Sequence, residues 1–414
     1  MKKLVTLLLV LLLTACGGSG SKEPAATEEP NKEEPVEEVV IDVTSLLDIK
    51  AKVNRETPLF QLEGEELREV GKLCEGAVID TSSDSRGNYV GLKGGEYYVH
   101  AADIENSGRY YRFDNHLLTL GSVSTAENYS LYDVKNHKLF SGEGSTSYDV
   151  VVRATEEDPR YGVLFLNQVV YLFKEDTQEF SETVPEGAAS SIPVLMYHFF
   201  YDDSKDPAPS DGNYLGVSEL DEQLNYLKEN GRDPLTMRET LYFMQGRAEV
   251  PDKAVTITID DGDPSVYEYA YPVFKKYGLN ATLFLICGWL DPEMPFEFWE
   301  MREAGMELQS HGFLTHQGGC EGMQHGGRIL CMDYEEGVQD TKMSLDYCDG
   351  GFAYCYPFGD FNDHAVQILK DAGVKIAFTT QNGWIDPSQD IYALPRVRVS
   401  GGQGLNAYIA NIER

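Results

Sequence analysis

Basic residues are scarce in this chain, which has 34 lysines and arginines against 68 aspartates and glutamates and a formal net charge of −34. This balance argues against nucleic acid or an anionic lipid surface as a partner, because both repel a strongly acidic protein. It is compatible with a neutral or cationic polysaccharide, although a solvated acidic surface accounts for most of these charges. The 414 residues, 42% of them hydrophobic, suffice for two or three domains with a sizeable core.

Long apolar runs are absent after the first residues of the chain. The run from Leu4 to Leu13 follows Lys2-Lys3 and precedes Leu13-Thr-Ala-Cys16. It is too short to span a membrane comfortably. Its basic start and the small residues before a cysteine resemble a bacterial lipoprotein signal, in which Cys16 is lipidated and becomes the mature N-terminus. We therefore expect residues 1–16 to be a signal peptide, and the protein to be exported and held by lipid on the outer face of the cell membrane.

Cysteine is also sparse, with six residues besides Cys16. An exported chain permits disulfides, and the local candidates are Cys320 with Cys331 or Cys348 with Cys355. The sequence does not decide between these pairings. Cys287 lies in a segment that reads as a buried strand, and we expect it to act as a small hydrophobic residue.

Residues 17–45 lack core-forming side chains until Val39, which predicts a disordered linker. Residues 46–183 contain short apolar and aromatic runs separated by turn residues, which is typical of an all-β region. Tyr89 to Ile104 matches Tyr161 to Asp176 at an offset of about 72 residues. This internal repeat predicts two related all-β units, over residues 46–110 and 111–183.

The repeated unit resembles the small barrel of the bacterial SH3 type. The resemblance lies in a Leu-Phe or Leu-Tyr start, a Gly-x-x-Val middle and a Tyr-Val end. It implies binding of cell-wall peptide or glycan, and a spacer without a ligand is an equal alternative.

Residues 184–191 read as a second linker, after which strand-like and helix-like segments alternate. Ile192 to His198 and Val255 to Ile259 read as buried strands, and each is followed by a helical pattern. Such alternation predicts βαβ units and a parallel sheet that could close into a barrel. The expected fold class for residues 192–414 is therefore α/β, and a small all-β region precedes it.

Two adjacent carboxylates, Asp260 and Asp261, end the strand that begins at Val255 and precede Gly262. The carboxyl end of a buried strand is where α/β folds place their active sites. Successive side chains at such a position point in different directions, so the two aspartates can hold different roles. A plain turn would need only one aspartate, and Asp263 before Pro264 already serves as the helix cap.

Histidines follow a later strand, at His311 and His316 in Ser310-His-Gly-Phe-Leu-Thr-His316. If the loop turns back, both rings reach one metal ion. With Asp261 they form a two-imidazole, one-carboxylate set that leaves coordination positions open, as catalytic metal sites require. A third segment, Phe352 to Gly359, has a Pro-x-Gly turn that could aim a backbone N–H at a developing oxyanion.

These segments together resemble the first three motifs of the polysaccharide deacetylases, the NodB-homology proteins of carbohydrate esterase family four. The resemblance covers about residues 192–400. The Ile192 to His198 opening and the Leu394-Pro-Arg-Val-Arg-Val399 close are similar to the poly-N-acetylglucosamine deacetylase branch in particular. The resemblance implies a distorted (β/α) barrel and metal-dependent removal of N-acetyl groups from glucosamine polymers.

By the same resemblance, Asp260 is the general base, and Asp261, His311 and His316 are the metal ligands. The backbone N–H of Phe358 contributes to the oxyanion hole, and His198 is the general acid, a role that suits an imidazole of near-neutral pKa. Tyr356 and Trp384 are expected to contact substrate, Trp384 as a wall of the acetyl pocket. For Trp384 a core aromatic is an equal alternative.

The sequence departs from the family pattern in three respects. The two histidines are five residues apart, whereas the commonest motif spaces them by four. The arginine that usually holds the catalytic aspartate is replaced by Cys355, and either Arg396 or Arg398 could take its place, with Arg396 favoured. The usual Leu-x-His near the C-terminus is absent, which is why His198 is considered as the acid.

The leading hypothesis is therefore an exported, metal-dependent N-deacetylase of peptidoglycan or poly-N-acetylglucosamine. Zinc is the metal that fits two histidines and one aspartate best. The alternatives are an O-acetyl esterase acting on acetylated polysaccharide, and a wall-binding lipoprotein without catalysis. The second alternative is less consistent with a chain that has kept both aspartates and both histidines.

Overall fold

The computed structural model of the protein describes residues 40–107, 115–321 and 325–413. The expected signal peptide, Cys16 and most of the expected first linker lie outside these ranges. Residues from Ile41 onwards form one compact unit. None of the helices in the described part of the chain is both long enough and apolar enough to cross a bilayer.

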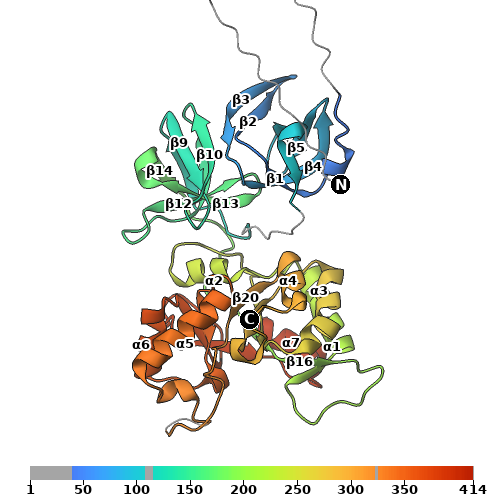
Figure 1. Ribbon diagram of the computed structural model, residues 1–414, viewed down its shortest axis with the longest axis vertical. Helices are drawn as coiled ribbons and strands as arrows, with labels where there is room; N and C mark the ends of the chain where they lie inside the picture. The colour runs from blue at the N-terminus through green and yellow to red at the C-terminus, as the bar shows by residue number, and fades with distance from the viewer. Residues whose placement is uncertain (1–39, 108–114, 322–324, 414) are drawn as a thin grey trace, which may run out of the picture. The chain divides into compact units, whose positions relative to one another are not determined.

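The described residues of the N-terminal part of this unit form strands and short 3-10 turns (Figure 1). The first seven strands are β1 (Lys50–Val53), β2 (Thr57–Glu63), β3 (Glu66–Leu73), β4 (Val78–Arg86), β5 (Tyr89–Leu92), β6 (Tyr97–His100) and β7 (Ile104–Asn106). The next seven are β8 (Gly121–Thr125), β9 (Asn128–Tyr132), β10 (Lys138–Glu143), β11 (Ser147–Val152), β12 (Arg160–Phe165), β13 (Gln168–Phe173) and β14 (Thr177–Glu182).

The second set of seven strands repeats the pairing order of the first. The first set is ordered β7-β1-β4-β5-β6-β2-β3, and the second is ordered β14-β8-β11-β12-β13-β9-β10. The sets join into one hydrogen-bonded sheet where β3 pairs with β10, with Phe140 opposite Leu73. Equal strand order in two segments offset by about 72 residues is the arrangement that a tandem duplication produces. The SH3-type assignment stays a prediction.

Both expected linkers are ordered over the part that the structure describes. Ile41 donates its backbone N–H to Oδ1 of Asn88 at 2.8 Å, and Ile41 and Val43 pack against the core of the β region. In the segment 184–191, Ala189 is buried and its N–H bonds to the carbonyl of Val250 at 2.9 Å. The contacts of the β region therefore begin at Ile41, and the segment 184–191 contacts the barrel half through Ala189.

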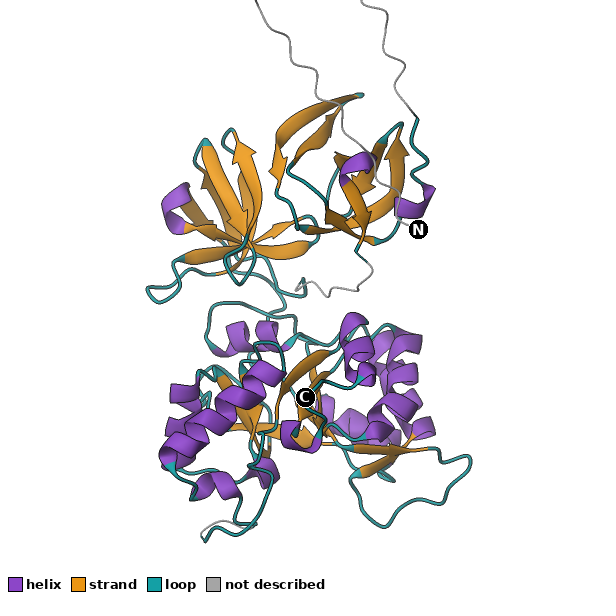
Figure 2. Cartoon of the chain, in the orientation of Figure 1, coloured by secondary structure: helices purple, strands orange, loops and turns teal. Residues whose placement is uncertain are grey.

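The C-terminal half is a closed barrel of parallel strands with helices outside it (Figure 2). Its strands are β15 (Val194–Tyr197), β18 (Thr256–Asp261), β19 (Thr282–Leu285), β20 (Glu307–Ser310), β21 (Ala353–Cys355), β22 (Ile376–Asn382) and β23 (Leu394–Arg398). The barrel closes where β15 pairs with β23, with Leu195 opposite Val397. The expected α/β barrel of the polysaccharide deacetylase type is confirmed.

The barrel helices begin and end at residues whose chemistry favours a cap. They are α1 (Val217–Glu229), α2 (Met237–Met244), α3 (Tyr271–Tyr277), α4 (Phe296–Glu303), α5 (Tyr334–Tyr347), α6 (Asp363–Ala372) and α7 (Gly404–Ile412). The side chains of Asp333 and Asn362 accept the first free N–H groups of α5 and α6. Gly278 and Gly373 end α3 and α6 in the left-handed conformation that favours glycine. A short strand pair, β16 (Phe199–Tyr201) and β17 (Tyr214–Gly216), lies after β15.

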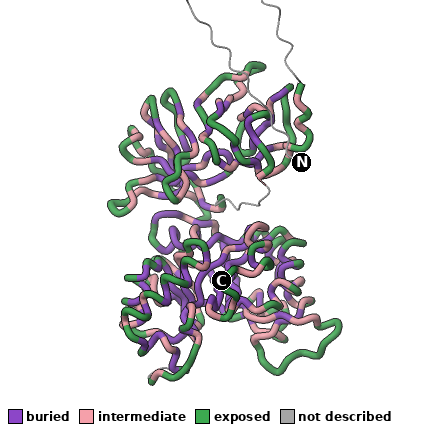
Figure 3. The backbone as a smooth tube through the Cα atoms, in the orientation of Figure 1, coloured by how far each residue is buried: buried purple, intermediate pink, exposed green. Residues whose placement is uncertain are grey.

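The barrel strands are buried on both faces, and the buried residues of the barrel half cluster along them (Figure 3). All four residues of β15 and of β19 are buried, as expected for strands that lie between a barrel interior and a helix layer. Because the strands are parallel, their carboxyl ends meet at one rim. The sequence therefore brings the polar residues that end β18 and β20 together.

Candidate active site

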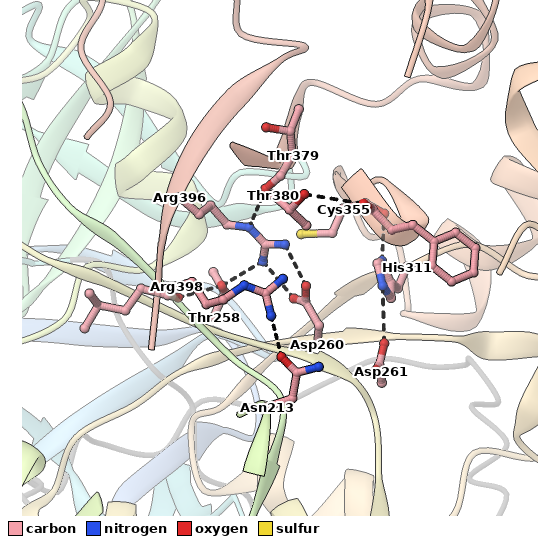
Figure 4. Close-up of polar contacts among 12 residues, drawn as sticks. Asn213, Thr258, Asp260, Asp261, His311, Cys355, Thr379, Thr380, Arg396 and Arg398 are labelled. Atoms are coloured by element: carbon pink, nitrogen blue, oxygen red, sulfur yellow. Dashed lines mark hydrogen bonds and ion pairs between the residues drawn. The ribbon is translucent and has the colours of Figure 1, made fainter. Parts of the chain in front are cut away.

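The carboxylate of Asp260 is held by a buried arginine on the last barrel strand (Figure 4). Nη1 of Arg396 donates to Oδ1 of Asp260 at 2.8 Å, and Nη2 donates to Oδ2 at 2.6 Å. Arg396 is 0% exposed, and its remaining donors bond to Oγ1 of Thr258 and to the carbonyl of Thr379, both at 3.0 Å. This is the bidentate geometry of a strong charge-assisted pair.

This pair keeps Asp260 ionised. Burial by itself would raise the pKa of Asp260, but the charge and hydrogen bonds of Arg396 outweigh it, and the pKa falls well below its usual range. Of the two arginines that the sequence offered, Arg396 lies against Asp260. Arg398 is exposed and contacts Asn213 instead.

Asp261 follows in a sharp turn that separates its side chain from that of Asp260. Its φ is +76°, and that of Gly262 is +77°. A non-glycine residue costs on the order of 1–3 kcal/mol in this region, and such residues concentrate at functional sites. The turn directs the Asp261 carboxylate towards the histidines that follow β20. Oδ1 of Asp261 lies 3.3 Å from Nε2 of His311 and 3.6 Å from Nε2 of His316.

His311 presents Nε2 to this carboxylate because its other ring nitrogen is already bonded. Nδ1 lies 2.8 Å from the carbonyl oxygen of Cys355, which can only accept a hydrogen bond. Nδ1 therefore carries a proton. In the neutral ring, Nε2 then has a lone pair that points towards Asp261. A backbone carbonyl in this position is the usual outer support of a metal-ligating histidine, and sequence alone could not identify it.

The three side chains fit a divalent cation. One donor atom from each of Asp261, His311 and His316 lies within 4.8 Å of the other two. Two imidazole nitrogens and a carboxylate form a donor set typical of catalytic metal sites. The rings of His311 and His316 lie 5.1 Å apart, so the five-residue spacing is absorbed by the loop. Burial and the neighbouring His311 lower the pKa of His316 to about 4, which favours the neutral, ligating ring.

His198 lies at the end of β15, within the electrostatic influence of both aspartates. Burial lowers its pKa, and the negative charges of Asp260 and Asp261 partly oppose this shift. Its Nδ1 is buried and has no hydrogen-bond partner among the described residues. The ring is therefore placed beside the carboxylates with one nitrogen uncommitted to the protein.

The Pro-x-Gly turn after β21 reaches the metal-ligating histidines. Phe358 has a φ of +63°, and its ring centroid lies 4.6 Å from that of His316. Gly359 must be glycine, because a Cβ there would lie 2.1 Å from Oγ1 of Thr380. The turn that was expected to present the N–H of Phe358 thus lies beside the site.

Two residues that were expected to contact substrate point elsewhere. The side chain of Tyr356 is fully buried in a hydrophobic cluster, and its hydroxyl donates to the carbonyl of Tyr392 at 3.0 Å. Substrate binding by Tyr356 stays a prediction, for a side chain whose contacts are with the hydrophobic cluster and Tyr392. Nε1 of Trp384 donates to the carbonyl of Asn411 at 3.0 Å, and the ring packs against the barrel core. For Trp384 the structure matches the alternative of a core aromatic.

Sequence reasoning missed one exposed aromatic beside the metal ligands. Trp289 follows β19, is 64% exposed, and lies edge-on to His316 with ring centroids 5.0 Å apart. Its position after a barrel strand, at the rim that carries the other site residues, was the available signal.

The cysteine-bearing loop after the metal ligands is closed by a disulfide between Cys320 and Cys331. Of the two local pairings considered, this one forms, and Cys348 and Cys355 are free and buried. Cys287 is buried too, as expected, with its sulfur 3.9 Å from that of Cys348.

Comparisons with known proteins agree with this geometry. Residues 247–377 match the family model of the polysaccharide deacetylases. The chain is 30% identical to YxkH of Bacillus subtilis over 231 residues, which cover 54% of this chain and 77% of the relative. It is 29% identical to a poly-beta-1,6-N-acetyl-D-glucosamine N-deacetylase of Staphylococcus aureus over 217 residues, which cover 49% of this chain and 72% of the relative.

Among solved structures, the Streptococcus pyogenes deacetylase PplD, in complex with acetate, matches with a TM-score of 0.47 and 24% identity. The match covers 54% of this chain and 99% of that structure.

The chain belongs to the polysaccharide deacetylase family. It is accordingly a hydrolase.

Proposed function

We propose that this protein is a metal-dependent N-deacetylase that removes acetyl groups from an N-acetylglucosamine-containing extracellular polysaccharide. The observation that carries the proposal is the pairing of a buried Asp260–Arg396 ion pair with the adjacent Asp261, His311 and His316 donor set. Asp260 can thereby serve in proton transfer, and Asp261 can bind a cation. The Staphylococcus aureus relatives, named for poly-beta-1,6-N-acetyl-D-glucosamine, support the choice of polymer.

In this mechanism Asp261, His311 and His316 would hold the cation, and zinc is the ion that suits their donor atoms best. When bound, it supplies polarisation of the acetyl carbonyl and activation of water. Asp260 accepts the proton of the attacking water, and Arg396 keeps its carboxylate oriented throughout. His198 delivers a proton to the departing sugar nitrogen, and the N–H of Phe358 steadies the negative oxygen of the acyl carbon.

We further infer that the enzyme works outside the cell, held to the membrane by a lipid on Cys16. The N-terminal segment supports this location by its basic start, its apolar run and the residues before Cys16. A tethered enzyme meets polymer at the cell surface. The duplicated β region would then serve as a wall-binding module or a spacer.

The test is acetate release from poly-N-acetylglucosamine oligomers, peptidoglycan and acetylated xylan, with Asp260→Asn as the control variant. We expect release from at least one of the two N-acetylated substrates, and a loss of about 100-fold or more in the variant. Release from acetylated xylan alone would show an O-acetyl esterase. No release from any of the three, with zinc supplied, would contradict the enzyme proposal.

A further inference from the structure

A cleft of about 1050 Å³ opens beside the metal ligands and is not explained by the chemistry of one acetyl group. Asp261 lines its inner end. Its sides are the π-helical stretch Val266–Ala270 with helix α3, and the segment from Trp289 to the first turn of α4. The cleft is thus continuous with the site through Asp261, and its volume leaves room for more than the reacting acetyl group.

Aromatic side chains form much of this cleft. Trp289 is 64% exposed, which is unusual for so large an apolar ring, and exposed apolar patches commonly mark binding grooves. Across from it, the rings of Tyr267 and Tyr271 lie nearly parallel, with centroids 5.7 Å apart. Flat aromatic faces are the surfaces on which the apolar C–H faces of sugar rings pack.

The same cleft carries an excess of negative charge. Besides Asp261 it is lined by four carboxylates, those of Asp263, Glu268, Glu297 and Glu300. Lys275 is the one basic residue in the lining, and its ammonium lies over the ring of Tyr271 and 4.0 Å from Glu300. Glu300 also accepts the hydroxyl of Tyr267 at 2.6 Å. Glu268 and Glu297 are therefore the carboxylates best placed to meet a cation from outside.

The proposed reaction generates such cations on the polymer. Water adds to the acetyl carbon, the C–N bond breaks, acetate leaves, and the sugar nitrogen takes a proton. The resulting amine is a cation when it is protonated, so turnover adds positive charge to the chain. A fully acetylated chain, in contrast, is neutral.

We propose that this cleft binds the sugar units next to the reacting one and prefers a chain that is already partly deacetylated. Trp289 stacks on one sugar ring, and Glu268 and Glu297 receive the ammonium groups of neighbouring glucosamine units. This inference rests on the proposed function and adds a substrate preference to it. Its consequence is that free amines accumulate in runs along the polymer, because each product favours the next turnover nearby.

The experiment compares kcat/KM for acetate release from N-acetylglucosamine oligomers of equal length, either fully acetylated or carrying one internal glucosamine. We expect the partly deacetylated oligomer to be preferred by about fivefold at low salt, the size expected for one or two exposed ion pairs. The preference should fall towards one at about 0.5 M sodium chloride, because exposed charges are then screened.

Matched variants separate the two contributions. Glu268→Gln with Glu297→Gln should abolish the preference by lowering kcat/KM for the partly deacetylated oligomer. Glu222→Gln, an exposed carboxylate on α1 outside the cleft, should retain the preference. Trp289→Ala should raise KM for both oligomers more than it lowers kcat, whereas Trp299→Ala, 39% exposed and outside the cleft lining, should not.

Equal or better use of the fully acetylated oligomer would overturn this inference and leave the proposed function standing. A preference that survives in the Glu268→Gln/Glu297→Gln variant would also overturn it. Failure to release acetate from either oligomer would instead count against the proposed function, and the inference would fall with it.

Discussion

Arg396 has a single function that the structure makes explicit, which is to neutralise and orient Asp260. It takes this role from the last barrel strand, because the position at the end of β21 that the family pattern gives to an arginine is occupied here by Cys355. The thiol of Cys355 is buried, and burial raises its pKa, so it cannot replace the missing charge. The site has therefore kept the ion pair while moving its cation to another strand.

Replacement of Arg396 by methionine should damage both stability and activity. It would leave the Asp260 carboxylate buried and unpaired, at a cost of about 3–5 kcal/mol in the free energy of unfolding. Acetate release should fall about 100-fold, since the carboxylate is no longer held in place. Urea unfolding followed by circular dichroism measures the first effect. Arg398→Met, two residues along and exposed, should change stability by less than about 0.5 kcal/mol, and equal losses in the two variants would refute this account.

Zinc should stabilise the protein through the three ligands alone. A ligand present at about 100 times its dissociation constant adds about 2.7 kcal/mol to the free energy of unfolding, so the melting temperature of chelator-treated protein should rise when zinc is returned. The zinc-induced rise should disappear in His316→Ala. It should persist in His364→Ala, because His364 bonds to the carbonyl of Met332, away from the three ligands. A zinc-induced rise of equal size in His316→Ala would show that the metal binds elsewhere.

At the scale of single elements, the helix limits were readable where capping chemistry sets them. Asp333, Asn362, Gly278 and Gly373 are of residue types that mark helix ends in a sequence, and each lies at such an end in the structure. Helix α2 was not predicted, although Thr236 and Glu239 have the spacing of a capping box. The π-helical stretch at the start of the helix after Asp263 has no known signature in the sequence.

The sequence allowed prediction of those site residues that lie at the ends of strands. Asp260, Asp261 and His311 lie together because parallel strands bring their carboxyl ends to one rim. The carbonyl support of His311 could not be predicted, since it is a backbone group of Cys355 and depends on register. The direction of the Tyr356 side chain could not be predicted either, because a motif position does not show which way a side chain points, and this one packs in a hydrophobic cluster.

The N-terminus of α2 offers a pH-dependent test at this scale. Glu239 and Thr236 form a reciprocal capping box, and Glu239 also accepts the backbone N–H of His116 at 2.7 Å. Burial alone would raise the pKa of Glu239, but its hydrogen bonds with His116 and with backbone N–H groups outweigh burial, and the pKa is lowered. A carboxyl whose pKa is lower in the folded state stabilises the protein above its ordinary pKa of about 4.3, and the effect is lost as pH falls below that value.

Glu239→Gln should therefore cost about 1–3 kcal/mol at pH 7, and this cost should shrink as pH falls below about 4.3. The free energy of unfolding measured by urea titration at several pH values gives the difference between wild type and variant. Glu157→Gln, an exposed residue in a turn of the β region, should show no such trend. A wild-type advantage that stays constant from pH 7 to pH 3 would mean that ionisation of Glu239 does not contribute.

At the scale of the whole molecule, the dominant property is the net charge of −34. A large excess of one sign keeps a protein soluble but destabilises its compact state by self-repulsion. Near the active site, the carboxylates of the cleft are part of this excess of negative charge. They would attract the proposed product, which is cationic. Stability and substrate preference are thus linked through one electrostatic field, and added salt should change them in opposite directions.

Raising sodium chloride from about 10 mM to about 150 mM should therefore raise the melting temperature while it weakens the preference for partly deacetylated oligomers. Screening shortens the Debye length from about 30 Å to about 8 Å over this range, which removes most of the repulsion between exposed carboxylates. Each kcal/mol so recovered should appear as about 2–4 °C in a calorimetric scan, or less for a chain of this size. Choline chloride should raise the melting temperature by the same amount as sodium chloride, because the effect depends on ionic strength and not on a bound sodium ion. A melting temperature that falls with salt would indicate that attractive pairs between exposed charges outweigh the general repulsion, and that the acidic excess does not destabilise the fold.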